Sequence, residues 1–112
     1  MAGAIALVNT VTGIAATTTN TPVFAQQGHA TASFLVDVQA VTGTWSVEFD
    51  YAISGRTLQI AKLTGINSTG LYFITLNASF PSSGAIPEPN SVIYAVVAVG
   101  TLTADTYVVY GD

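Results

Sequence analysis

The sequence predicts an all-β fold, an antiparallel β-sandwich or jelly-roll-like barrel of about seven or eight strands. In several segments, apolar residues recur at every second position, which is the period of a half-buried strand. Glycine, proline and asparagine separate these segments at short intervals. No stretch of ten or more residues has the apolar spacing and end caps of a helix. The 112 residues are therefore expected to form a single β domain over residues 1–112.

The first 29 residues are expected to supply edge strands or an N-terminal arm. Residues 4–8 and 14–18 predict two short strands, with a turn at residues 10–13 between them. The threonine-rich run that follows is broken by Pro22, which has no amide hydrogen to donate to a neighbouring strand. A proline at this point is typical of a sheet edge.

The clearest strand pattern lies in residues 34–39 and 45–54, where apolar residues alternate with others. The link Thr42-Gly43-Thr44 is short enough for a β-hairpin, and Gly43 can take the positive φ of a tight turn. We therefore expect the two strands to pair, with one acidic face and one apolar face. The apolar face would carry Phe34, Val36, Val38, Trp45, Val47, Phe49, Tyr51 and Ile53.

After this pair, residues 54–57 predict a compact turn with Gly55 at the first central position of a type II′ connection. Residues 71–77 predict a strand that is apolar on both faces, which favours a central place in a sheet. A loop with three prolines is expected at residues 79–90. The chain would close with strands at residues 91–99 and 106–110.

The composition indicates contact with other chains. Apolar residues make up 50% of the chain and charged residues 7%, and the mean hydropathy is +0.56. These values are high for a soluble monomer, so we expect a homo-oligomer or another covered surface. The alternative is that threonine, serine, asparagine and glutamine supply an uncharged polar exterior.

The charge balance excludes one class of partner. The net charge is −4, the pI is about 4.4, and Arg56 and Lys62 are the only basic residues. Direct binding to nucleic acid depends on a basic face that releases counterions, so no nucleic-acid partner is expected.

Membrane association and cysteine chemistry are not expected either. Residues 1–8 are apolar but lack the basic start of a secretory signal. The apolar run of residues 92–99 is far shorter than the roughly 20 residues that cross a bilayer as a helix. The absence of cysteine excludes a disulfide or a thiolate metal site.

No reactive constellation is found, so the chain is not expected to be an enzyme and no catalytic, cofactor-binding or metal residues are assigned. His29 is the only histidine, and without partners it is interpreted as a solvated loop residue. Glu48 and Asp50 share a face and could act as paired carboxylates or bind calcium, with Asp37 opposite them across the hairpin. The simpler interpretation, a solvated sheet face, is preferred.

The remaining candidate side chains are interpreted structurally. Arg56 and Lys62 are expected to pair with Glu48 or Asp50 across the neighbouring strand, as exposed ion pairs of about 0 to 1 kcal/mol. Aromatic residues could line a groove on which sugars stack, or could anchor the core and the subunit interfaces, and the second role is preferred. These residues are Trp45, Tyr72, Tyr94, Tyr107 and Tyr110.

Five pieces within residues 30–112 form a further pattern. They are the strand FLVDVQAVTGT at 34–44, the turn SGR at 54–56, TGLY at 69–72, Pro89 before the run at 92–99, and TYVV at 106–109. Together these pieces resemble small structural proteins of tailed phages that decorate or cement the capsid, whereas the first 29 residues depart from the pattern of that family.

The resemblance implies a β-sandwich that binds the major capsid protein on the outer surface of an assembled virion, often as a homotrimer. Such a protein would act through many shallow contacts, and multivalent attachment would raise its affinity. We hypothesise that residues 2–27 and 79–90 supply adhesive extended edges. The competing hypothesis is a carbohydrate-binding or host-attachment module of a virion.

Overall fold

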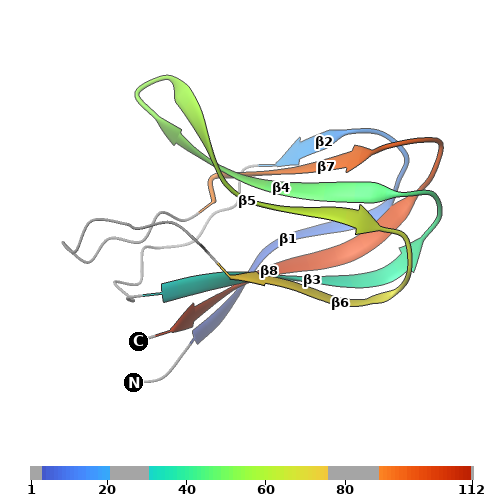
Figure 1. The fold of residues 1–112 in the computed structure, drawn as a ribbon, viewed down its shortest axis with the longest axis horizontal. Coiled ribbons are helices and arrows are strands. Elements are labelled where there is room, and N and C mark those ends of the chain that lie inside the picture. The colour runs from blue at the N-terminus through green and yellow to red at the C-terminus, as the bar shows by residue number, and fades with distance from the viewer. Residues whose placement is uncertain (1–3, 21–30, 76–88, 112) are drawn as a thin grey trace.

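The computed structural model describes residues 4–20, 31–75 and 89–111. These residues form eight strands in two four-stranded antiparallel sheets that face each other (Figure 1). The order in the first sheet is β1 (Ala4–Ile14), β8 (Leu102–Gly111), β3 (Thr31–Val41) and β6 (Gly70–Thr75). The order in the second sheet is β2 (Thr18–Asn20), β7 (Ser91–Val96), β4 (Trp45–Ile53) and β5 (Arg56–Ile66).

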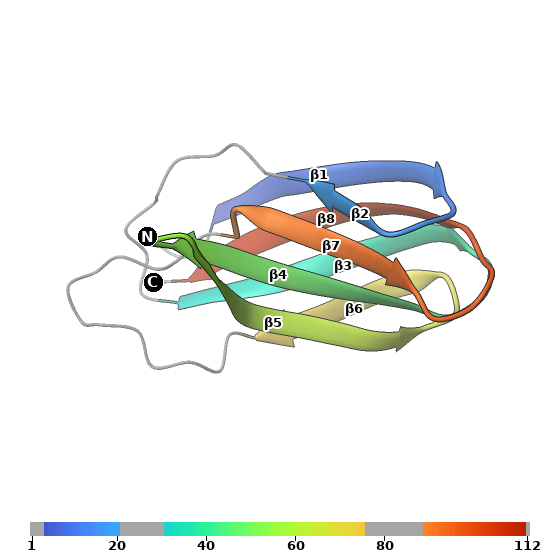
Figure 2. The ribbon, with the colours of Figure 1, turned by 90° about the horizontal axis from the view of Figure 1, so that it is seen from above.

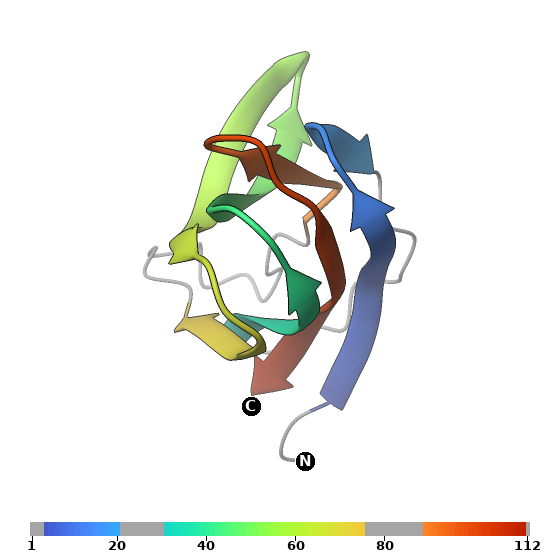
Figure 3. The same cartoon turned by 90° about the vertical axis from the view of Figure 1, so that its right-hand side faces the viewer.

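This strand order is that of an eight-stranded jelly roll, so the predicted fold class is confirmed. The chain changes sheet at every connection except the β4–β5 turn. Figure 2 shows the consequence from above: β2 lies over β1, β7 over β8, β4 over β3, and β5 over β6. Figure 3 shows the two layers from the end at which the chain crosses from β1 to β2, from β3 to β4, from β5 to β6 and from β7 to β8.

The core lies between the sheets and is built from the inward half of each alternating strand. The largest side chains that are fully buried come from both layers, and Phe34 of β3 stacks on Phe49 of β4. The indole of Trp45 is buried with them and donates a 3.1 Å hydrogen bond to the carbonyl of Thr42. Other fully buried members are Val36, Val38, Val47, Ile66, Val92, Tyr94, Leu102 and Val108.

The predicted hairpin between residues 34–39 and 45–54 is wrong. β3 pairs with β6 and β8, and β4 pairs with β5 and β7, so the link at Gly43 crosses from one sheet to the other. The alternation itself is correct, because Phe34 and Phe49 both face inward. In the jelly roll, the apolar faces of β3 and β4 lie against each other instead of side by side.

Several further local predictions differ from the structure. β1 is continuous through the predicted turn at residues 10–13, although Gly13 has φ +58° and the pairing with β8 shifts there. Ser54 and Gly55 both have positive φ, which is the signature of a type I′ turn and not of type II′. β8 begins at Leu102, earlier than predicted, and β6 is an edge strand and not a central one.

The first 29 residues are predicted to supply edge strands or an arm, and the structure describes two strands in this part of the chain. β1 and β2 each lie at the edge of a sheet, and β1 pairs with β8 from Ala4 to Ile14. Residues 21–29 and most of the predicted loop at 79–90 lie outside the described residues. No helix that could span a membrane occurs in the described part of the chain.

Candidate functional site

Large apolar side chains are exposed on the outer face of the first sheet. Ile5 and Leu7 of β1 are 61% and 53% exposed, and Leu71 and Phe73 of β6 are 69% and 57% exposed. Such side chains are ordinary when scattered singly, but a contiguous group of them marks a contact surface. The register of the strands decides whether these residues are contiguous.

The register joins them into one row across all four strands. Leu7 lies opposite Tyr107, Tyr107 opposite Leu35, and Leu35 opposite Phe73. Directly opposite side chains share a face, and at a strand spacing of about 4.8 Å the row is roughly 14 Å wide. With their neighbours on the same face they form the outer patch, which we define as Ile5, Leu7, Leu35, Leu71, Phe73, Tyr107 and Val109.

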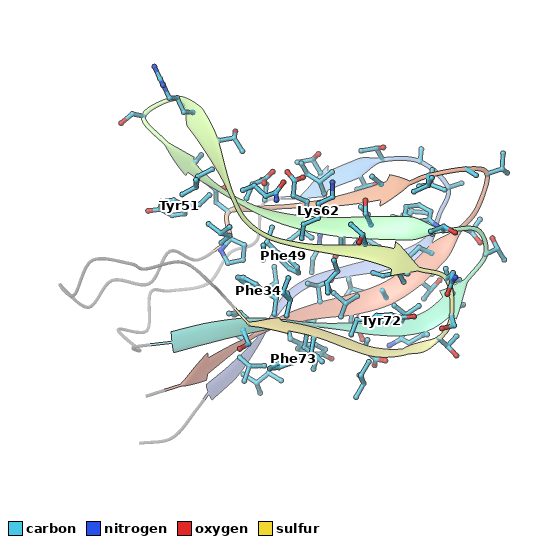
Figure 4. All side chains as sticks on the ribbon, in the orientation of Figure 1. Phe34, Phe49, Tyr51, Lys62, Tyr72 and Phe73 are labelled. Atoms are coloured by element: carbon cyan, nitrogen blue, oxygen red, sulfur yellow. The ribbon has the colours of Figure 1, made fainter. Side chains whose placement is uncertain are left out.

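The outer patch arises because these strands are apolar on both faces. In β6, Tyr72 and Ile74 pack against the core, while Leu71 and Phe73 point outward. In β8, Val108 is buried and its neighbours Tyr107 and Val109 lie on the outer face. Figure 4 shows Phe73 on the side of the first sheet that faces away from Phe34 and Phe49. A two-layer fold covers only one of these two faces.

One side of the outer patch is polar. Asp37 and Asp105 lie directly opposite each other on β3 and β8, and Leu71 is the next residue across from Asp37. Gln39 Nε2 donates to Asp105 Oδ2 at 2.9 Å and to Asp37 Oδ2 at 3.5 Å, and Thr10 Oγ1 donates to Asp105 Oδ1 at 2.8 Å. We call Thr10, Asp37, Gln39 and Asp105 the acidic cluster.

The predicted grouping of Asp37 with Glu48 and Asp50 is wrong, because Asp37 belongs to the other sheet. Glu48 and Asp50 do interact on β4, but the preferred interpretation of a solvated sheet face is wrong for Asp50, which is buried. Asp50 is only 1% exposed and its Oδ1 atom has no hydrogen-bond partner. Burial, a hydrogen bond with Glu48 and the charge of Glu48 together raise the pKa of Asp50 to about 7.

The surroundings of this pair are given by the register. Lys62 lies opposite Glu48 on β5, and Asp50 lies opposite Gln59 on β5 and Ser91 on β7. Arg56, the second basic residue, lies at the end of the β4–β5 hairpin, opposite Ile53. His29 lies outside the described residues. Within residues 4–20, 31–75 and 89–111, no three His, Cys, Asp or Glu side chains gather where they could hold a metal ion.

The predicted aromatic residues do not share one groove. Trp45 and Tyr94 are fully buried in the core, as the anchor interpretation predicts. The Tyr94 hydroxyl lies 2.8 Å from Thr106 Oγ1, and burial raises the pKa of Tyr94 to about 12. Tyr72 faces inward with its hydroxyl bonded to Ser68, whereas Tyr107 lies in the outer patch. The side chain of Tyr110 is outside the described part.

A second apolar feature, at the opposite end of the sandwich from the first residues of β1, is the β7–β8 loop. Val97 and Val99 are 74% and 98% exposed. The loop is fixed to the β3–β4 link by paired backbone hydrogen bonds between Thr42 and Thr101, and by a bond from Val97 N to Thr44 O. We call Val97 and Val99 the loop tip.

No protein-family model matches the sequence, and no curated protein matches it. One chain in a solved structure of infectious bursal disease virus, Gx strain, is similar with a TM-score of 0.34 and 10% identity. The likeness covers 99% of this chain but only 28% of that viral chain. A TM-score this low does not establish a relationship, and membership of the phage decoration family is not shown.

Sequence reasoning missed the outer patch as a site. The signal was present in residues 71–75, where apolar residues occupy both faces. That pattern predicts a central strand, because two buried faces explain it within one chain. β6 is instead an edge strand, and its second apolar face is exposed.

Proposed function

We propose that this chain is a non-enzymatic structural protein of a virion, which decorates and stabilises the outer surface of a phage capsid. The outer patch would pack on the lattice of the major capsid protein. The observation that carries this proposal is the apolar row from Leu7 to Phe73, which spans every strand of one sheet and is left uncovered by the fold.

The patch has the composition of a contact surface. It combines two aromatic residues, Tyr107 and Phe73, with four leucine or isoleucine side chains and one valine. It is built on a hydrogen-bonded sheet, so its backbone is already ordered and loses little freedom on binding. An open sheet face of this kind suits a shallow, extended contact better than a small ligand, which is usually bound in a concave pocket.

The jelly-roll fold is consistent with the proposal, but the proposal does not rest on it. Jelly rolls are common among viral capsid and lectin domains, and the same fold serves unrelated functions. We further propose that the chain acts as a homotrimer, because several linked patches on one lattice bind far more tightly than one. The trimer contact would then lie away from the outer patch.

The proposal is tested on virus particles from the source culture. Particles purified on a density gradient should contain this chain in a fixed ratio to the major shell protein, measured by quantitative mass spectrometry. Cryo-electron microscopy of the same particles should place the first sheet against the outer shell surface. Absence of the chain from the particles, or its location in the interior, would refute the proposal.

The second candidate is a glycan-binding module of a virion. It is favoured by one observation: Tyr107 lies on an exposed sheet face next to the polar side chains of Asp37, Gln39 and Asp105. Aromatic rings beside hydrogen-bonding groups are suited to sugars. Binding of the isolated chain to a glycan array, lost in Tyr107→Ala, would support this candidate instead.

A further inference from the structure

We infer that the partner of the outer patch brings a basic side chain, which binds between Asp37 and Asp105. This inference rests on the proposed function and defines the chemistry of the partner surface. It commits to a foreign protein that combines an apolar area with an arginine or lysine at its edge, and it excludes a second copy of this chain on the patch.

The first argument is the placement of the two carboxylates. Asp37 and Asp105 are directly opposite on adjacent strands, where like charges repel. They lie on the same face as the row from Leu7 to Phe73, about two residues further along the strands. A partner that covers the row therefore also covers the carboxylates or lies at their edge.

The second argument concerns what these carboxylates bind within the chain. Their hydrogen-bond donors are the neutral side chains of Gln39 and Thr10. Arg56 and Lys62, the only basic residues of the sequence, both belong to β5 in the other sheet. Two negative charges beside an apolar contact surface thus have no cation supplied by their own sheet.

The third argument is the cost of covering them. Removing a carboxylate from water without a counter-charge is strongly unfavourable, whereas a buried pair with a cation offsets much of this cost. An arginine guanidinium can donate to two carboxylates at once, which matches a pair on adjacent strands. The partner that binds this face must therefore bring positive charge.

The same reasoning excludes a two-fold contact of the patch with itself. In such a contact each outer patch would face the outer patch of the other copy, and neither contains a basic residue. Whichever way the two copies are related, the carboxylates of each acidic cluster would then be covered by a sheet that supplies no arginine or lysine. The charge of this face is thus complementary to a foreign surface and not to its own.

The chemistry can be tested with a matched pair of peptides. The probes are acetyl-Leu-Arg-Leu-amide and the same peptide with citrulline, which replaces the guanidinium by a neutral urea group. In an NMR titration of the full ¹⁵N-labelled chain, the arginine peptide should shift the amide signals of Asp37, Gln39 and Asp105. We expect it to bind at least fivefold more tightly than the citrulline peptide.

Variants of the chain identify the residues that cause the preference for the arginine peptide. The double variant Asp37→Asn/Asp105→Asn should remove the preference for arginine, while Glu48→Gln, which removes a charge from the other sheet, should keep it. Equal binding of both peptides, or signal shifts confined to other residues, would overturn the inference. Circular dichroism of each variant shows that the fold is retained.

Capsids assembled without this chain separate the inference from the proposed function. Asp37→Asn/Asp105→Asn should rebind at least tenfold more weakly than the original chain. If this variant binds normally while Leu7→Ser/Phe73→Ser does not, the inference fails and the proposed function stands. If both variants bind normally, the contact surface of the proposed function is wrong. A dimer in light scattering that Leu7→Ser/Phe73→Ser dissociates would assign the patch to a second copy and overturn both.

Discussion

The rings of Phe34 and Phe49 stack with their centroids 4.2 Å apart and their planes at 12°, although the two residues belong to different sheets. Only three residues, Thr42 to Thr44, separate the two strands that carry them. The stack thus bridges the two layers inside the core (Figure 4). If β3 and β4 paired side by side in one sheet, as a hairpin, these two rings would not stack in this way.

Replacing either ring should therefore be costly. Phe34→Ala is expected to lower the free energy of unfolding by about 3–5 kcal/mol, because it opens a cavity between the sheets. Phe73→Ala, which removes the same side chain from an exposed position, should cost less than about 1 kcal/mol. Urea denaturation measures both. Equal losses for the two variants would contradict the placement of Phe34 in the core.

The close approach of Gly100 to the β3–β4 link predicts a second stability effect. A Cβ atom at Gly100 would lie 2.1 Å from the carbonyl oxygen of Thr42, so Gly100→Ala must displace backbone. The control is Gly65→Ala. Gly65 has φ +72°, but a Cβ atom there would have no other atom within 4 Å. We therefore expect this variant to lose only about 1–2 kcal/mol of the free energy of unfolding. Thermal unfolding should rank Gly100→Ala as the more destabilised variant. The reverse order would show that the link and the β7–β8 loop are not in contact.

Asp50 predicts a specific dependence of stability on pH. Its pKa is raised from 3.8 to about 7 in the folded state, so between about pH 4 and pH 7 the folded state binds a proton that the unfolded state has lost. The contribution of this group to stability is therefore present at low pH and is lost as pH rises, by up to about 1.4 kcal/mol per pH unit.

The variant Asp50→Asn removes this dependence. Urea denaturation at pH 5 and pH 8 should show that the original chain loses more stability than the variant over this interval. The variant should be the more stable of the two at pH 8, where the original chain buries a charged Asp50 beside Glu48. The same pH profile in both proteins would rule out a raised pKa for Asp50.

The hydrogen bond between Tyr94 and Thr106 joins β7 of one sheet to β8 of the other inside the core. Tyr94→Phe leaves Thr106 Oγ1 buried without this partner, at an expected cost of about 1–3 kcal/mol. Replacing both residues, as Tyr94→Phe/Thr106→Val, should cost less than the sum of the single changes. If the losses in the free energy of unfolding are strictly additive, the two hydroxyls contribute to stability independently and the hydrogen bond between them is not supported.

The fold class was predictable because the alternation is local. Phe34 to Val38 and Trp45 to Phe49 carry the period of a strand whichever strand they pair with. The partner strand was not predictable from this pattern, because a short link with a glycine serves both a hairpin and a crossing between layers. The deciding contacts, such as Gly43 against Val99, join residues far apart in the chain.

The candidate site was only partly visible for the same reason. Glu48 and Asp50 could be placed on one face, because they are two residues apart on one strand. Asp37 was assigned to the wrong partners, because its true neighbour Asp105 lies 68 positions later and is brought there by the jelly-roll order. The row from Leu7 to Phe73 likewise takes one residue from each of four strands, so no single segment reveals it.

The most direct test of the account is the rebinding of purified chain to capsids assembled without it. Leu7→Ser/Phe73→Ser removes two exposed residues of the outer patch, and Val97→Ser/Val99→Ser removes two exposed residues of the loop tip as a matched control. Occupancy by cryo-electron microscopy should fall at least tenfold for the patch variant and stay unchanged for the control. Full occupancy by a folded patch variant would contradict the central claim that the outer patch is the surface that binds the capsid.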